Sequence, residues 1–484
     1  MSTAEIHAAP QVTDRGRRDA VLLAGVLLAC VTVPTAVSGS GVALPAIAQD
    51  TSAGTTSLQW VVNAFNLAFA GSTLLAGSLA DLFGRQRGFA VGVGLFLVAS
   101  VVSATAPTIA VLDVGRAIAG IGAAAIFACG SALLAARFEG PAQARAFALL
   151  GTAAGIGLGI GPTVAGVLVD AFDWEALFGA GALSAVVVLA LLWWGRADEP
   201  RPDHGARIDA PGAVTFVGGL VLLMVAIVQA SAWGWLSTST LGALVVGTLL
   251  LAAFARIERS APHPLLDTKL LRDGELVGLI LVPVVAAVGF VTLLTYLPTY
   301  MSVVWGDGVG TAGLRMLFAT VPVVAAPLLA GAFVARGATP RAVIVASLVL
   351  LVAGPALLLL IGPDRSPWVA VPGMVAIGAG FGLGVGLVDG QAIARVAPER
   401  AGMAAGLVNT SRLGSEAVAV ALYASVLASL LASRGAADPA HAYDDTFHTV
   451  LLGLVVLTAA LAVLTAALLA RGAAPANANS EESR

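Results

Sequence analysis

The chain has 484 residues, of which 58% are hydrophobic and only 11% are charged, and its formal net charge is −3. A soluble domain carries about 25% charged residues, so this composition excludes an ordinary soluble enzyme or soluble binding domain. The small negative net charge also predicts no nucleic-acid partner, because nucleic-acid-binding domains present an excess of basic residues.

The apolar residues fall into fourteen runs of about 20 residues, the length that crosses the hydrocarbon core of a bilayer. Short clusters of charged residues separate these runs. The runs lie near 21–46, 57–80, 88–107, 109–136, 144–169, 175–195, 211–231, 238–256, 276–300, 311–334, 342–361, 367–393, 402–432 and 447–470. The sequence therefore predicts an all-α polytopic membrane protein with 14 transmembrane helices in a lipid bilayer.

Arginine placement predicts the orientation, since loops on the cytoplasmic side carry an excess of basic residues. With the N-terminus inside, most of the 25 basic residues fall on inner segments, whereas the outer loops hold only Arg365 and Arg434. Three more, Arg116, Arg315 and Arg412, fall within predicted helices. Both termini are therefore expected in the cytoplasm. The abundance of alanine, glycine and arginine is typical of a high-GC bacterium, so we expect a bacterial inner membrane.

The charged segments 196–210 and 257–275 bracket a hairpin and suggest a 6 + 2 + 6 arrangement of helices. A short turn at 331–341 keeps the glycine and arginine of an earlier turn at 77–87, which indicates a weak internal repeat. The predicted parts are a cytoplasmic tail (1–20), a six-helix bundle (21–195), an inserted transmembrane hairpin with its cytoplasmic loop (196–257), a second six-helix bundle (258–470) and a second cytoplasmic tail (471–484).

The short inner loop between the second and third runs is Gly77-Ser-Leu-Ala-Asp81-Leu-Phe-Gly84-Arg85-Gln-Arg87. Gly77 and Gly84 permit a close approach of helices and a tight turn. Asp81 can face a helix N-terminus, where a carboxylate is favoured, and Arg85 anchors the inner face. The alternative is an ordinary charged loop, but few frameworks need this combination between two membrane helices.

The fourth run begins with Leu-Asp113-Val-Gly-Arg116, and Arg116 lies roughly 12 Å into the helix at about 1.5 Å per residue. An arginine at that depth is costly unless it is paired or hydrated, so it is a functional candidate. Asp113 is one turn earlier on the same face and is the nearest partner along the sequence. The alternatives are a purely structural ion pair, or an Asp113 that simply reaches the outer interface.

The fifth run contains Gly155-Ile-Gly157-Leu-Gly159-Ile-Gly161-Pro162-Thr-Val-Ala-Gly166. Gly157 and Gly161 form a face of small residues, with Gly166 further along, against which another helix can pack closely and rock. Pro162 removes a backbone donor and bends the helix. Generic close packing is the alternative interpretation.

Together these three stretches resemble motifs of the major facilitator superfamily of transporters: the loop 2–3 turn, the helix 4 arginine and the helix 5 antiporter signature, which is typical of exporters. The resemblance covers nearly the whole chain and implies two six-helix bundles plus an inserted two-helix hairpin. Further stretches resemble the fourteen-helix drug:proton antiporter branch: Val42-Ala-Leu-Pro45, Trp60-Val-Val, Ile208-Asp209-Ala-Pro-Gly212, Trp233-Gly-Trp235, Pro264-Leu-Leu-Asp267 and Arg412-Leu-Gly414.

The chain also departs from that branch. The aspartate common in helix 1 is replaced by Ala36, and the glutamine three residues after the helix 4 arginine is Ala119. The usual tryptophan-arginine-tryptophan at the start of helix 6 is Trp174-Glu175-Ala176. The usual helix 1 site for a proton or cation is therefore missing, so coupling has moved elsewhere or the transporter is atypical.

Embedded charges offer substitutes for that site. Glu416 lies in the thirteenth run, four residues after Arg412, so the two share a face and could pair. Desolvation favours the protonated form of such an acid and Arg412 favours its charged form, which suits a group that loads and releases a proton. Asp389 could be a proton relay or merely interfacial. Arg315 is a third embedded cation or a snorkelling side chain.

Candidate substrate contacts come from two regions. Asn63 and Asn66, with Gln59 one turn earlier, suggest a polar stripe toward a central cavity, or else hydrogen bonds between packed helices. Tyr296 and Tyr300 lie at the outer end of the ninth run, where they contact substrate or belong to an interfacial aromatic belt.

The leading hypothesis is a secondary active transporter that exports drugs or amphipathic metabolites in exchange for protons by alternating access. Glu416, Asp113 and Asp389 are the proton-coupling candidates, with Arg116, Arg412 and Arg315 as charge partners. We expect a small amphipathic substrate, a monomer, and no cofactor beyond the proton gradient.

Two other functions stay open. An uncoupled facilitator or importer of a small metabolite is supported by the missing helix 1 acid. A non-transporting membrane sensor would retain the fold without the activity. An enzyme is not expected, because the sequence shows no nucleophile–base constellation and no cluster of metal ligands.

Overall fold

The computed structural model describes residues 10–51, 53, 55–195, 209–260, 270–307, 309–397, 400–433 and 439–471. The regular structure of these residues is entirely helical, and they contain no strand. The prediction of an all-α protein is therefore confirmed.

The N-terminal half contains α1 (Pro10–Thr51), α2 (Thr55–Phe83), α3 (Arg85–Ala104), α4 (Ile109–Arg137), α5 (Gly140–Phe172) and α6 (Glu175–Trp194). A hairpin follows, made of α7 (Ala210–Trp233) and α8 (Thr238–Glu258). The C-terminal half contains η1 (Leu270–Arg272), α9 (Gly274–Ala286), η2 (Ala287–Val291), α10 (Thr292–Val304), α11 (Val309–Ala335), α12 (Pro340–Leu358), η3 (Pro367–Ala370), α13 (Val371–Gly384), α14 (Leu387–Ala394), α15 (Ala401–Ser433) and α16 (Pro439–Arg471).

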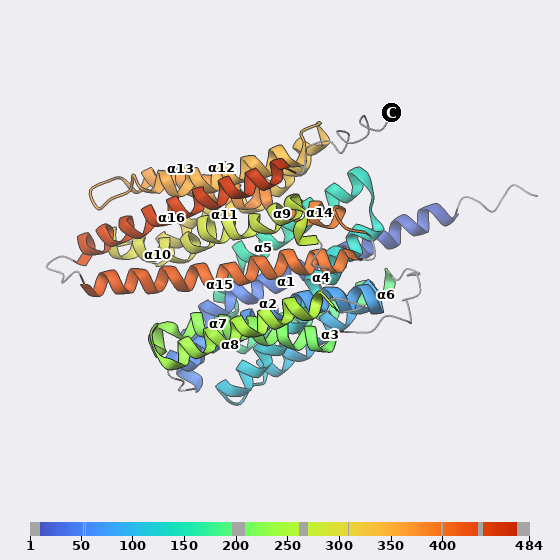
Figure 1. Ribbon diagram of the computed structural model, residues 1–484. Coiled ribbons are helices and arrows are strands. Elements are labelled where there is room, and N and C mark those ends of the chain that lie inside the picture. Colours follow the sequence, from blue (N-terminus) through green and yellow to red (C-terminus); the bar gives the residue numbers. More distant parts are fainter. Residues whose placement is uncertain are drawn as a thin grey trace, which may run out of the picture.

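Twelve helical segments of the described chain are long and apolar enough to cross a membrane. Gly274–Val304 and Pro367–Ala394 each count as one crossing, although each is divided into several elements. α7 and α15 are not among the twelve, although they run beside the other helices (Figure 1). The expected number of 14 therefore stays a prediction.

Each half packs in the same pattern. α1 lies against α5, while α2 and α3 lie against α4. In the second half, α9 with η2 and α10 lies against α15, and α11 and α12 lie against α13. The two largest apolar cores follow the same division, because one is built mainly by α1–α6 and the other by α9–α16. The internal repeat suggested by the sequence thus has a counterpart in the packing.

The halves meet closely at one end of the molecule, which we call the terminal end because α1 begins and α16 ends there (Figure 1). A Cβ added to Gly77 of α2 would lie 2.0 Å from the carbonyl oxygen of Gly402 of α15. A Cβ added to Gly155 of α5 would lie 3.1 Å from the carbonyl oxygen of Val323 of α11. The two pairs α2–α15 and α5–α11 therefore join the halves through backbone contacts that require glycine.

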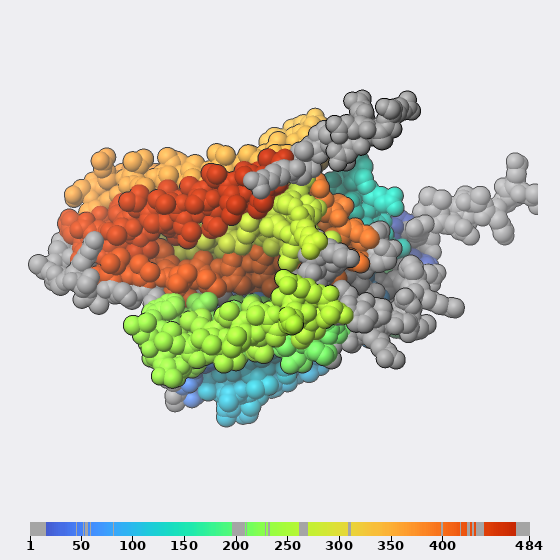
Figure 2. All heavy atoms as spheres, viewed as in Figure 1, coloured from blue at the N-terminus to red at the C-terminus, as the bar shows by residue number. Residues whose placement is uncertain are grey.

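The hairpin covers one of these junctions. Phe216 of α7 and Phe254 of α8 pack with their ring centroids 5.0 Å apart. They belong to one apolar cluster with Leu74 of α2 and Met403 of α15. The hairpin thus lies over the α2–α15 contact, and its green surface is seen in front of the orange α15 in Figure 2.

Substituting Gly77 by alanine tests the close contact between the halves. The added methyl group would meet backbone atoms of α15, which cannot turn aside as a side chain can. We expect a loss of about 1–3 kcal/mol in stability, the usual cost of overpacking, seen as a lower melting temperature of the purified protein. Gly166→Ala is the matched control, because nothing lies within 4 Å of its added Cβ. Equal melting temperatures for the two variants would contradict this packing.

Candidate functional site

A cavity of about 1090 Å³ lies between the two halves. α1, α2 and α5 line one side of it, and η2, α10, α11 and α15 line the opposite side. α7 and Trp235 in the turn after α7 complete the wall. Most of the lining side chains are apolar, and a few polar groups converge among them, which is the usual form of a small-molecule site.

The expected polar stripe faces this cavity. Asn63 and Asn66 of α2 both line it, and so does Tyr296 of α10. The side chain of Gln59 lies outside the described residues. Tyr300 does not belong to a lipid-facing belt, because it is fully buried and its hydroxyl donates to a carboxylate oxygen of Asp444 on α16.

Glu416 of α15 is the one acidic side chain that lines the cavity among the described residues. It is half-buried, and its charge interacts with that of Arg412 one turn earlier. The carboxylate therefore reaches the space in which a substrate would lie, while its own helix supplies a neighbouring cation.

The expected ion pair between Arg412 and Glu416 is not the pair that forms. Arg412 instead donates to Asp389 Oδ1 of α14 at 2.8 Å and to Asn409 Oδ1 at 2.7 Å. Asp389 is only 2% exposed, so this carboxylate is buried beside its cation, and its role as a proton relay stays a prediction. Asp389 reaches Arg412 because the helical backbone is interrupted before it. α13 ends at Gly384 and α14 begins after Gly386, whose φ of 76° suits glycine.

Arg116 is 1% exposed within the N-terminal half. Its Nε donates to the carbonyl oxygen of Val61 at 2.9 Å, and one terminal nitrogen donates to Ser40 Oγ at 3.1 Å. Its guanidinium also lies 4.5 Å from the ring centroid of Phe65. Asp113 interacts with it electrostatically, but Asp113 Oδ1 is buried without a hydrogen-bond partner in the described chain. Arg116 therefore ties α4 to α1 and α2, and neither charge lines the cavity.

Arg315 forms an ion pair with Asp307, in the connection between α10 and α11. Its guanidinium lies 5.5 Å from the ring centroid of Trp305, whose indole nitrogen donates to the carbonyl oxygen of Gly362. Arg315 therefore has a charged partner, and whether it also snorkels toward the membrane surface stays a prediction. Gly313 and Leu314, which precede Arg315, line the cavity, so this ion pair lies beside its wall.

The predicted turn between α2 and α3 is formed by Gly84, which has a φ of 100° and precedes the first residue of α3, Arg85. Gly77 makes the contact with α15 described above. The side chain of Asp81 lies outside the described residues, so its expected position facing a helix N-terminus stays a prediction.

The small-residue face of α5 packs against α1. A Cβ on Gly157 would lie 2.2 Å from the carbonyl oxygen of Val31, and one on Gly161 would lie 2.0 Å from Ser38 Oγ. Pro162 is exposed and lines the cavity. Gly166 does not belong to this face, because nothing lies within 4 Å of a Cβ added there. Beyond the proline α5 still packs on α1, but through Ala165, which shares an apolar cluster with Ala43 and Ile47.

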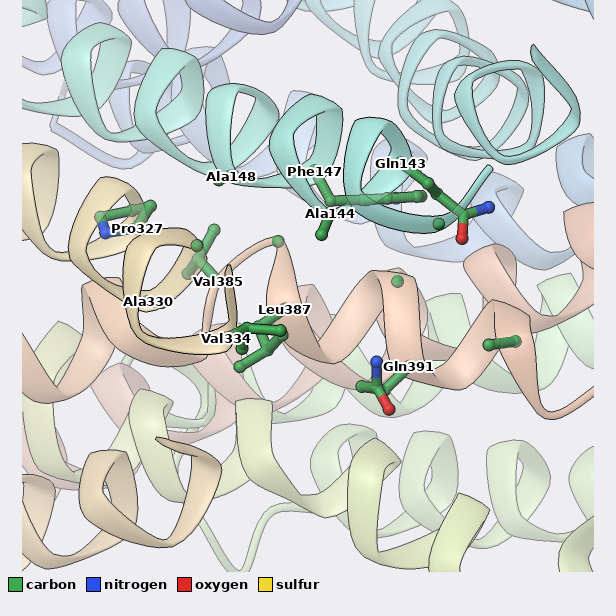
Figure 3. A pocket seen from close by; sticks show the side chains of 15 residues that line it. Gln143, Ala144, Phe147, Ala148, Pro327, Ala330, Val334, Val385, Leu387 and Gln391 are labelled. Carbon is green, nitrogen blue, oxygen red and sulfur yellow. The ribbon is translucent and has the colours of Figure 1, made fainter. Parts of the chain in front are cut away.

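A second cavity, of about 220 Å³, lies at the terminal end (Figure 3). α5 contributes Gln143 and Phe147, α11 contributes Pro327, and α14 contributes Gln391. This cavity could not be predicted from the sequence, because it forms only where the two halves meet. Figure 3 shows the two glutamines at one end of an otherwise apolar gap.

The described residues contain no group of three or more His, Cys, Asp or Glu side chains that could hold a metal ion. Two tyrosines that the sequence did not single out, Tyr423 of α15 and Tyr443 of α16, are buried behind Tyr296. The only sequence signal that could have identified them is that tyrosine is rare in this chain, which has only 4.

Comparisons with known proteins agree with this architecture. A sequence profile described as Major Facilitator Superfamily matches residues 26–420. The puromycin resistance protein pur8 of Streptomyces alboniger is 34% identical over 437 residues, which are 87% of this chain and 86% of that protein. The cephamycin export protein CmcT of Amycolatopsis lactamdurans is 31% identical over 96% of both chains. The human organic anion transporter MFSD10 has a similar structure, with a TM-score of 0.63 and 16% identity over 93% of this chain and 99% of that one.

Removing one partner of the buried pair tests its energetics. Arg412→Gln leaves the Asp389 carboxylate buried without its cation, so we expect a loss of about 3–5 kcal/mol in stability, read as a lower melting temperature. The double variant Arg412→Gln/Asp389→Asn should recover most of this loss, because no uncompensated charge remains. Arg336→Gln, at an exposed position, should melt like the wild type. A double variant no more stable than Arg412→Gln would show that the loss does not come from an uncompensated Asp389 carboxylate.

Proposed function

The chain belongs to the major facilitator superfamily of transporters, and on this premise we propose that it exports small amphipathic molecules in exchange for protons. The observation that carries the proposal is the placement of Glu416 in the wall of a large, mostly apolar cavity between two halves. Relatives named for drug resistance and antibiotic export support the direction of transport. No cofactor is needed, because the proton gradient supplies the energy.

Sidedness follows from the basic residues. The terminal end carries many of them, and the positive-inside rule assigns such an end to the cytoplasm. The cavity lies toward the other end, beyond the glycine contacts that join the halves, so we infer that this conformation faces outward. Both termini are then cytoplasmic, in a bacterial inner membrane. The basic residues of this end include Arg18, Arg85, Arg87, Arg137, Arg336, Arg341 and Arg395.

The coupling step uses two carboxylates that share one guanidinium. In the outward-facing state, Arg412 holds Asp389 as an ion pair, and Glu416 faces the water-filled cavity. A proton from the outside neutralises Glu416 and favours release of the substrate. When the halves rock, the contacts at the terminal end separate, and Glu416 returns its proton to the cytoplasm while a new substrate binds. The deprotonated Glu416 then competes with Asp389 for Arg412.

We also propose that the chain has the predicted domain organisation, with bundles over 21–195 and 258–470 and the hairpin over 196–257. α7 and α15 would complete a set of 14 transmembrane helices, as in the fourteen-helix branch. α15 supports this, because it lines the cavity together with helices that are long and apolar enough to span. The protein would act as a monomer, since each chain encloses its own cavity.

An uncoupled facilitator is the second candidate, and Ala36 favours it. Ala36 is buried in the apolar core of the N-terminal half, where the branch commonly has an acid. Transport by a facilitator would not need a proton gradient.

Efflux of ethidium from cells that express the protein distinguishes proton-coupled export from facilitated transport. For the wild type we expect efflux that a protonophore abolishes. Glu416→Gln should reduce efflux to the level of cells lacking the protein, because a neutral amide cannot load or release a proton. Glu139→Gln is the matched control, since Glu139 is exposed and far along the chain from every cavity residue of α15. Efflux that survives both the protonophore and the Glu416 substitution would establish facilitated transport instead.

A further inference from the structure

All 4 tyrosines of the chain lie in the C-terminal half, toward the end of the molecule opposite the terminal end. Tyr296 and Tyr300 come from α10, Tyr423 from α15 and Tyr443 from α16. The rings of Tyr296 and Tyr423 are stacked, with centroids 4.5 Å apart and an interplanar angle of 26°. The ring centroid of Tyr300 lies 6.3 Å from that of Tyr443 and 4.6 Å from that of Phe447. Three helices that are distant in sequence thus build one aromatic cluster.

The hydroxyl groups of this cluster are not equally satisfied. Tyr300 donates to Asp444. Tyr423 and Tyr443 are only 4% and 7% exposed, and in the described chain their hydroxyl oxygens are buried without a hydrogen-bond partner. The hydroxyls of Tyr423, Tyr443 and Tyr296 are close enough to interact electrostatically. A buried hydroxyl without a partner is costly, so in a native protein it indicates a place that another polar group fills.

Tyr296 stands between this point and the cavity. It lines the cavity, and its ring covers that of Tyr423. The segment that carries it is bordered by the π-helical turn η2 on one side and by Pro298 on the other, both of which interrupt the regular hydrogen bonds of a helix. A small movement of this segment would open the two buried hydroxyls to the cavity.

We propose that Tyr296, Tyr423 and Tyr443 form a recognition subsite for a planar aromatic ring that carries a neutral hydrogen-bond acceptor, such as a ring carbonyl. The ring would stack on Tyr296, and the hydroxyls of Tyr423 and Tyr443 would donate to the carbonyl oxygen. A neutral acceptor is favoured over a carboxylate, because Glu416 shares the cavity and Asp444 lies beside Tyr300. This inference names a substrate class and rests on the proposed export function.

Binding of radiolabelled 9-fluorenone and of fluorene to the purified protein tests the subsite. The two planar probes differ only in the ring carbonyl. We expect the wild type to bind fluorenone more tightly, and Tyr423→Phe or Tyr443→Phe to weaken fluorenone binding about three- to tenfold, the worth of one hydrogen bond. Fluorene binding should not change in either variant, and Tyr296→Leu should weaken both probes. Tyr300→Phe is the matched control, because its hydroxyl is bonded to Asp444.

Thermal unfolding without ligand separates recognition from a structural role. Removing an unpartnered hydroxyl should not lower the melting temperature, so Tyr423→Phe and Tyr443→Phe should melt at or above the wild-type temperature. Equal fluorenone binding by the wild type and both variants would overturn the subsite, as would a wild type that binds neither probe. This assay uses no proton gradient, so hydroxyl-dependent binding together with gradient-independent efflux would reject the coupling mechanism and keep the subsite.

Discussion

The backbone contact between the halves at the terminal end is the constraint on which the rest of the structure depends. Gly77 of α2 and Gly402 of α15 lie so close that a single methyl group would separate them. Gly386 makes a similar contact, since its Cβ would lie 2.3 Å from the carbonyl oxygen of Phe147. The cavity lies beyond these contacts, toward the opposite end of the molecule. Alternating access then requires these contacts to break, which only small residues make inexpensive.

The placement of charge follows from a second constraint, the cost of burying an ion without a partner. Arg412 meets it with Asp389 and Asn409, and Arg116 meets it with a backbone carbonyl, a serine hydroxyl and an aromatic face. Among the described residues Glu416 has no hydrogen-bond or ion-pair partner, and it faces the cavity. An acid in that position is free to change its protonation state as the access of water changes, whereas Asp389 is held by its cation in this conformation.

Helical class and the close-packing glycines could be predicted from local sequence, because length, hydropathy and residue size determine them. Asn63 and Asn66 could also be placed, since their spacing puts them on one helix face. The partner of Arg412 could not be predicted, because the spacing of residues i and i+4 identifies neighbours only within one helix. Asp389 reaches it through a break at Gly386 that hydropathy does not reveal. The tyrosine cluster was likewise invisible, because three helices must fold together before its members meet.

The internal repeat relates positions on the two walls of the cavity, and the side chains at these positions differ in chemistry. Gly77 faces Gly402 of α15 in one junction between the halves, and Gly331 faces Ala148 of α5 in the other. The sequence offset that relates these two glycines also relates Pro162 of α5 to Glu416 of α15, and both residues line the cavity. Where the N-terminal half places a helix-bending proline, the C-terminal half therefore places an acid. The N-terminal wall offers neutral polar groups, while the acid and the tyrosines both belong to the opposite wall, so the coupling and the selectivity that we propose would reside in the same half of the molecule.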